Sequence, residues 1–200
     1  MRLLLFFVIL FSSIGRNAAF AANDFKAIEN DIKTIRDTIF AESAQKASRH
    51  FTFIYLQQDS QAVSEMAEAL ETAYPRISTG LKINISPITV FVYPSLKSFH
   101  SIIPMKEVPD WVAGKAWGNN EIHIVSLNNP GPVHNRKSIS TIAVHEFAHC
   151  ATAQISELTL DFPCWLTEGI ALFFAGQFQN PKDFAYIREG NYPSLGLLSD

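Results

Sequence analysis

Two histidines and a glutamate stand close together in the segment His145-Glu146-Phe147-Ala148-His149. In a helix, residues four apart lie about 40° apart around the axis and one turn along it, so both imidazoles can reach one metal ion. Zinc accepts such nitrogen ligands, and a catalytic zinc site keeps three protein ligands and a water molecule. Glu146 is placed to act as general base toward that water. The pattern therefore predicts the metal-binding helix of a hydrolase.

A third protein ligand is expected downstream, and Glu168 is the candidate. It stands in the segment Cys164-Trp165-Leu166-Thr167-Glu168-Gly169-Ile170-Ala171, with 18 residues between it and His149. That gap suits a helix end, a connection and the first turn of a second helix, where the helix dipole stabilises a carboxylate. Alone, Glu168 would be an ordinary acidic residue at a helix N-terminus. Beside the upstream pattern, we expect it to be the third metal ligand.

The rest of the sequence predicts the elements that hold these side chains. β-Branched and aromatic runs predict strands, periodic apolar residues predict helices, and Gly118-Asn119-Asn120 predicts a hairpin turn. The predicted elements are strand 51–56, helix 60–74 ended by Pro75 and Gly80, strand 88–93, helix 95–102, strands 113–117 and 121–125, and helices 138–153 and 165–178. This order predicts an α+β fold with a small mixed or antiparallel sheet, an edge hairpin and two following helices.

An N-terminal segment, residues 22–50, is expected to form an amphipathic helix over 24–49. Its apolar residues are spaced alternately three and four apart, which lays one stripe along a helix: Phe25, Ile28, Ile32, Ile35 and Ile39. We expect this helix to pack on a domain formed by residues 51–200. A short coiled coil or a pro-segment is the alternative.

The first 21 residues have the pattern of a secretory signal peptide. Arg2 is followed by the apolar run Leu3–Phe11 and by the small-x-small sequence Ala19-Phe20-Ala21, a cleavage pattern. A membrane anchor is the alternative, but the apolar stretch is shorter than the roughly 20 residues that a spanning helix needs. We therefore expect an exported protein, periplasmic or secreted, with no stable membrane anchor after cleavage.

Composition and charge exclude several classes of protein. The 200 residues are 48% hydrophobic and 18% charged, which suits one packed core and argues against a disordered tail. The net charge is −3, and removal of residues 1–21 leaves 14 basic and 19 acidic residues, a net charge of −5. Such a chain lacks the basic surface of a nucleic-acid-binding protein.

The His-Glu-x-x-His pattern, the 18-residue gap and the sequence W-L-x-E-G-x-A together resemble the gluzincin zinc metallopeptidases. The likeness is to the aminopeptidase N-like branch and to the smaller peptidase MA-like bacterial domains. The resemblance implies a zincin-like fold, with one zinc ion held by His145, His149 and Glu168, Glu146 as catalytic base, and a peptide or protein substrate. It also implies that strand 113–117 or 121–125 is an edge strand that binds an extended peptide beside the metal.

The chain departs from that family at several positions. Leu172 stands where thermolysin-like relatives carry an acid that hydrogen-bonds a zinc histidine, and no G-x-M-E-N aminopeptidase sequence is present. Tyr186 and Tyr192 are the candidates for stabilising the oxyanion, with a packing role as their alternative. The family's helical C-terminal part would continue beyond Asp200, so we expect the chain to be truncated or part of a longer product.

Two other functions therefore stay open beside the peptidase. One is a non-catalytic binding or assembly protein that keeps the fold and the metal. The other is a zinc hydrolase acting on a non-peptide amide.

The cysteines and the other histidines complete the candidate residues. A disulfide between Cys150 and Cys164 would tie the two metal-bearing helices together, contributing about 3 kcal/mol for a loop of roughly 15 residues. The alternatives are two reduced, buried thiols or thiolate zinc ligands; helix geometry disfavours the latter for Cys150, which points about 100° away from His149. We expect the remaining histidines to be exposed at the surface: His50, His100, His123 and His134.

Overall fold

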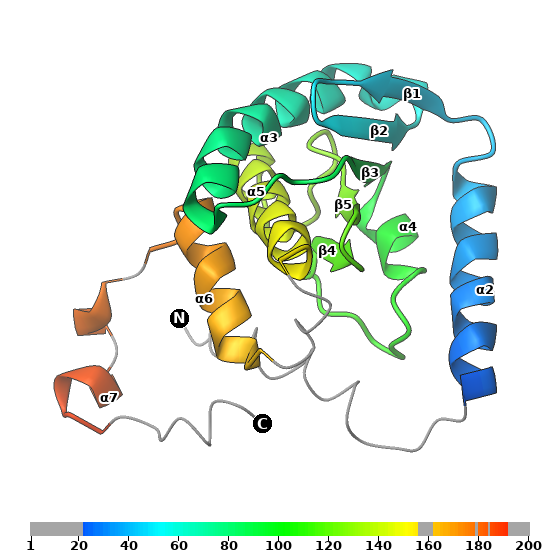
Figure 1. The fold of residues 1–200 in the computed structure, drawn as a ribbon. Helices are drawn as coiled ribbons and strands as arrows, with labels where there is room; N and C mark the ends of the chain where they lie inside the picture. The colour runs from blue at the N-terminus through cyan, green and yellow to red at the C-terminus, as the bar shows by residue number, and fades with distance from the viewer. Residues whose placement is uncertain (1–21, 156–161, 179, 184, 192–200) are drawn as a thin grey trace.

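The computed structural model describes residues 22–155, 162–178, 180–183 and 185–191, which form the expected α+β fold (Figure 1). The five strands are β1 (Ala44–Ala47), β2 (Phe51–Tyr55), β3 (Ile88–Tyr93), β4 (Gly114–Trp117) and β5 (Glu121–Val125). They form one sheet in the order β1-β2-β3-β5-β4. The three central strands run parallel, and the edge strands β1 and β4 pair antiparallel with their neighbours, so the sheet is mixed.

The helices cover the sheet in layers. They are α2 (Ala22–Ile39), α3 (Ser60–Leu81), α4 (Leu96–His100), α5 (Arg136–Ala153), α6 (Cys164–Ala175) and α7 (Ala185–Arg188), with short 3-10 turns at Gln57–Asp59 and Pro181–Asp183. Helices α3 and α5 pack against one face of the sheet, and α6 packs beside α5, whereas α2 stands on the other side of the sheet (Figure 1). Among the described helices, none has the length and apolar character needed to cross a membrane.

The sheet face beneath α3 and α5 forms the main core. Phe53, Val90 and Ile122 lie side by side on β2, β3 and β5, and all three are fully buried. Met66 and Leu70 of α3 belong to the same buried cluster. This alternation of inward apolar residues is the pattern that predicted strands here, and it fixes the register because a slip by one residue would expose the whole set.

The opposite face is attached to α2 by aromatic and charged side chains. Phe40 meets Tyr93 edge-on, with ring centroids 5.0 Å apart. The Arg36 guanidinium lies 4.8 Å from the centroid of the Phe91 ring and donates to Glu121 Oε2 at 3.2 Å. These contacts hold the C-terminal half of α2 against β3 and β5.

His123 is buried on this second face, so the expectation that it is exposed was wrong. Only 1% of its surface is accessible, because Tyr93, Phe91 and Trp117 surround its ring. Its Nδ1 lies 2.9 Å from the Tyr93 hydroxyl and its Nε2 3.2 Å from Glu121 Oε2. Burial lowers the pKa of His123, and the hydrogen bond with Glu121 only partly offsets this effect.

The other three histidines are half-buried and hydrogen-bonded, rather than simply exposed. His50 stacks on Tyr74 with ring centroids 3.5 Å apart, and its Nδ1 lies 2.6 Å from Glu71 Oε2. The Nε2 atom of His100 lies 2.8 Å from the backbone carbonyl of Val112, and that of His134 lies 2.8 Å from the backbone carbonyl of Trp111. These rings therefore brace loops and strand ends.

The expected N-terminal helix ends ten residues too late. Helix α2 ends at Ile39, and residues 44–47 form the edge strand β1, which pairs antiparallel with β2. The sheet therefore begins before residue 51, and the boundary expected at that residue was wrong. The strand is held by backbone pairing and alternates between half-buried and exposed residues, so its sequence AQKA carries no apolar signal.

Helix α3 also differs, because it continues through Pro75 to Leu81. Proline removes one helical hydrogen bond and normally ends or bends a helix. Here the last turn is held by tertiary packing, since Ile77 is fully buried and Arg76 donates to the carbonyl of Phe174 in α6. A left-handed Lys82 then ends the helix.

Candidate metal centre

Three side chains from α5 and α6 converge in the structure as the sequence predicts. His145 and His149 lie one turn apart on α5, and their Nε2 atoms are 3.0 Å apart. Glu168 on α6 places Oε2 3.3 Å from His145 Nε2 and Oε1 3.4 Å from His149 Nε2. Within the described residues, this is the group of His, Cys, Asp and Glu side chains that could hold a metal ion.

The chemistry of these side chains fits a zinc ion, because two imidazoles and one carboxylate are a donor set that zinc takes in catalytic sites. The two ring nitrogens are 3.0 Å apart, and each lies 3.3–3.4 Å from a different carboxylate oxygen of Glu168. With one ligand atom from each residue, all three atoms lie within 4.8 Å of one another. The residues present therefore fit the ion that the sequence suggests.

Electrostatics in this pocket favour a positive charge. Burial by itself would raise the pKa of Glu168, but hydrogen bonds and charges from His145 and His149 lower it to about 2. Burial likewise opposes the charging of His145, yet the bond to Glu168 and the charges of Glu146 and Glu168 raise the pKa of its ring. A carboxylate held ionised beside two imidazoles suits a cation bound among them.

Glu146 lies beside the cluster and is held by the edge strand β4. Its side chain is buried, and Oε2 accepts a hydrogen bond of 2.8 Å from the backbone N–H of Ala116. Close packing of β4 on α5 makes this bond possible. A Cβ on Gly114 would lie 2.7 Å from Ile142 Cγ2 and 3.2 Å from Glu146 Cγ, so only glycine leaves room there.

The outer edge of β4 faces this site with its backbone groups. Lys115 pairs with His123, and the Val125 N–H donates to the carbonyl of Ala113. Because antiparallel partners alternate between bonded and non-bonded pairs, the N–H and C=O groups of Gly114 and Ala116 point away from β5. One of them, the Ala116 N–H, meets Glu146. The candidate base therefore sits at the open edge of the sheet.

Helix α6 holds Glu168 in place through contacts with two other helices. It lies along α5 and also reaches α3, where a Cβ on Gly80 would come within 2.7 Å of the Phe174 ring. Arg76 of α3 donates to the carbonyl of Phe174. These contacts orient the carboxylate toward the two histidines.

Gln177 is a contact of the cluster that the sequence did not reveal. Its Oε1 lies 2.8 Å from His145 Nδ1, the ring nitrogen that faces away from Glu168. Histidines that bind metals usually donate from the second nitrogen to an acceptor, and the Gln177 carboxamide oxygen is placed to be that acceptor here. No local pattern marks Gln177, because its role depends on how the chain turns after α6.

The expected disulfide between Cys150 and Cys164 is not formed. Cys150 is fully buried on the sheet side of α5, where its thiol donates to the carbonyl of Glu121 at 3.4 Å. This direction is away from α6, which carries Cys164. Burial raises the pKa of the Cys150 thiol, so it is a poor source of thiolate.

The two candidate oxyanion donors stay predictions. Tyr192 lies outside the described residues, as do residues 1–21 with the expected signal peptide. Tyr186 lies in α7, but its side chain is outside the described part of the structure.

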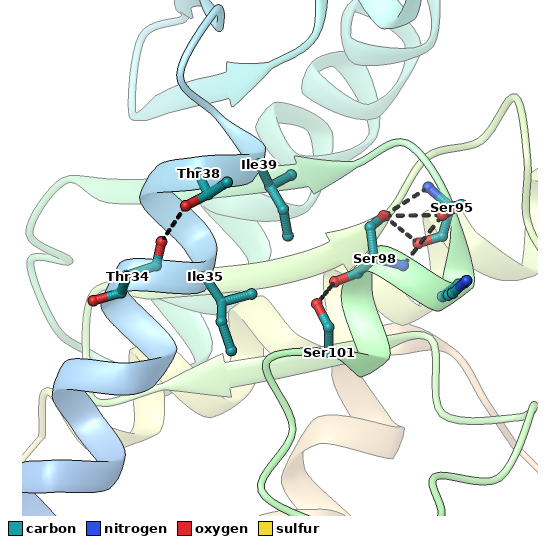
Figure 2. A pocket seen from close by; sticks show the side chains of 8 residues that line it. Thr34, Ile35, Thr38, Ile39, Ser95, Ser98 and Ser101 are labelled. Carbon is teal, nitrogen blue, oxygen red and sulfur yellow. Dashed lines mark hydrogen bonds between the residues drawn. The ribbon is translucent and has the colours of Figure 1, made fainter.

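A separate open cavity of about 430 Å³ lies between α2 and α4 (Figure 2). It is lined by Thr34, Ile35, Thr38, Ile39, Ser95, Lys97, Ser98 and Ser101. Hydroxyl groups on its walls bond within their own helices, as Thr38 does to the carbonyl of Thr34 and Ser101 to that of Ser98. None of the residues lining it belongs to the His145 cluster, so we regard the cluster as the candidate site.

Comparison of the chain with protein-family models, with curated proteins and with solved structures yields no match. The functional argument therefore depends on the residues of the site and on their geometry.

Proposed function

We propose that this chain is an exported zinc-dependent metallopeptidase of the gluzincin type. The observation that supports the proposal is the convergence of His145, His149 and Glu168 beside a buried Glu146. His145, His149 and Glu168 would hold the zinc ion, which when bound would supply Lewis acidity and a nucleophilic water molecule.

In this proposal, strand β4 orients the substrate. An extended peptide pairs with the outward N–H and C=O of Gly114 and with the C=O of Ala116, as an added strand does at a sheet edge, while the Ala116 N–H stays bonded to Glu146. The scissile carbonyl then lies next to Glu146, which itself bonds to β4. Pairing through the backbone favours an unfolded or extended peptide over a small amide.

Glu146 acts as the proton carrier. Its carboxylate takes a proton from the attacking water as the C–O bond forms, and it delivers that proton to the leaving amine as the C–N bond breaks. The Ala116 N–H holds one carboxylate oxygen at 2.8 Å, and in this proposal the other carboxylate oxygen carries the proton. A positioned base of this kind contributes about 10²–10⁴-fold to the rate.

The test compares zinc content and peptide hydrolysis in the wild type and in Glu146→Gln. We expect one zinc ion per chain in both proteins, with kcat lowered about 10²–10⁴-fold in the variant. Glu68→Gln, on an exposed position of α3, is the matched control and should keep full activity.

Two results would reject this proposal. Absence of bound zinc in the wild type would remove the metal site itself. Stoichiometric zinc without hydrolysis of a broad peptide library would point to a non-catalytic binding protein. If such a protein cleaves amides other than peptides, it is a different zinc hydrolase.

A further inference from the structure

We propose that Gln177 is a positioning residue that selects the metal-binding tautomer of His145, an inference that rests on the proposed metal site. The Gln177 carboxamide oxygen lies 2.8 Å from His145 Nδ1. The other ring nitrogen, Nε2, faces His149 Nε2 at 3.0 Å and Glu168 Oε2 at 3.3 Å. Neutral imidazole carries one proton, and only its placement on Nδ1 leaves the Nε2 lone pair for a metal.

The carboxamide of Gln177 can act in two ways, unlike a carboxylate. With Oε1 toward the ring, it accepts the Nδ1 proton and favours the metal-binding tautomer. With its NH₂ group toward the ring, it would donate to Nδ1, and the proton would lie on Nε2. A carboxylate can only accept, so replacement of Gln177 by glutamate should keep the selected tautomer.

The chain reaches this position through a left-handed turn after α6. Gly176 ends the helix with a φ of 68°, a conformation that glycine adopts without steric cost. The Gln177 N–H then donates to the carbonyl of Leu172 at 3.0 Å. This bond to the last turn of α6 fixes the backbone of Gln177 beside the helix that carries Glu168.

Helix α6 thus supplies two contacts to the cluster from its two ends. Glu168 near its start faces the Nε2 side of His145, and Gln177 after its end faces the Nδ1 side. The His145 ring is 4% exposed and lies between them. A rigid ring orientation is what a metal ligand requires.

The test measures zinc affinity by competition with a chelator in the wild type, Gln177→Met and Gln177→Glu. Methionine has similar length but offers no comparable acceptor, so we expect zinc affinity to fall about 10–100-fold. Glutamate should retain at least the wild-type affinity. Gln61→Met, at an exposed position on α3, is the matched control and should leave zinc affinity unchanged.

A second readout does not depend on zinc. NMR nitrogen shifts of the His145 ring, followed in metal-free protein up to a pH at which the ring is neutral, should report the Nδ1–H tautomer in the wild type and in Gln177→Glu, and a mixture in Gln177→Met. Equal zinc affinity in wild type and Gln177→Met would overturn the inference, as would equal loss in both variants. If the wild type binds no zinc, the proposed function fails, and the ring tautomer alone decides whether Gln177 has this role.

Discussion

Substitution of Gly114 tests how the edge strand β4 is held against helix α5. An alanine Cβ would lie 2.7 Å from Ile142 Cγ2, far inside van der Waals contact, and 3.2 Å from Glu146 Cγ. Ile142 is nearly buried and has little space to retreat. Overpacking of this kind costs about 1–3 kcal/mol, so we expect Gly114→Ala to lower the free energy of unfolding by about 2 kcal/mol.

Urea unfolding measures this loss. With a slope of about 2 kcal/mol per molar urea for a domain of this size, the midpoint should fall by about 1 M. Gly169→Ala is the matched control, because Gly169 lies in α6 and an added Cβ there meets nothing within 4 Å. That variant should be stabilised by about 0.5–1 kcal/mol, since alanine is the better helix former.

The double variant Gly114→Ala/Ile142→Ala tests the cause. Removal of Ile142 Cγ2 takes away the closest clash, so the two changes should couple favourably by about 1–3 kcal/mol. If the effects of the two substitutions simply add, steric contact with Ile142 does not explain the need for glycine. If Gly114→Ala has the same urea midpoint as the wild type, a Cβ at position 114 does not clash with α5.

Three further predictions concern the metal, the buried histidine and α2. Zinc at 100 times its Kd should raise the free energy of unfolding by about 2.7 kcal/mol, and both a chelator and His149→Ala should abolish this gain in a thermal melt. Because burial lowers the pKa of His123, the unfolded chain takes up its proton first as pH falls below the ordinary histidine value. Stability should therefore drop between about pH 7 and 5, by at most about 1.4 kcal/mol per pH unit for this residue, and less steeply in His123→Gln. Arg36→Met should cost about 1–3 kcal/mol and speed proteolysis within α2, whereas Lys33→Met, exposed on the same helix, should do neither.

Much of the fold could be predicted because its strands bury one face. The pattern of β3 and the β4–β5 hairpin gave bounds within a residue of those observed. The proximity of His145 and His149 followed from helical spacing, and that of Glu168 from its place at the start of a second helix. Strand β1 was missed because edge pairing needs backbone contacts and no apolar pattern. The burial of His123 was not predicted, because the rings that surround it, including Trp117 and Tyr93, lie on the neighbouring strands β4 and β3. Gln177 could not be found, since a single turn at Gly176 decides where it lies.

Strand β4 also bears on the hazard of self-association at an open sheet edge. An open edge of a sheet is a template on which another copy can add a strand, and proteins limit this hazard with short strands and charged residues. Here the edge strand has four residues, includes Lys115, and has one outward N–H occupied by Glu146. Loss of that carboxylate would free the N–H and lengthen the stretch available for intermolecular pairing. Glutamine at position 146 keeps an acceptor there, so it is a safer probe of the base than alanine, whose inactivity could reflect aggregation.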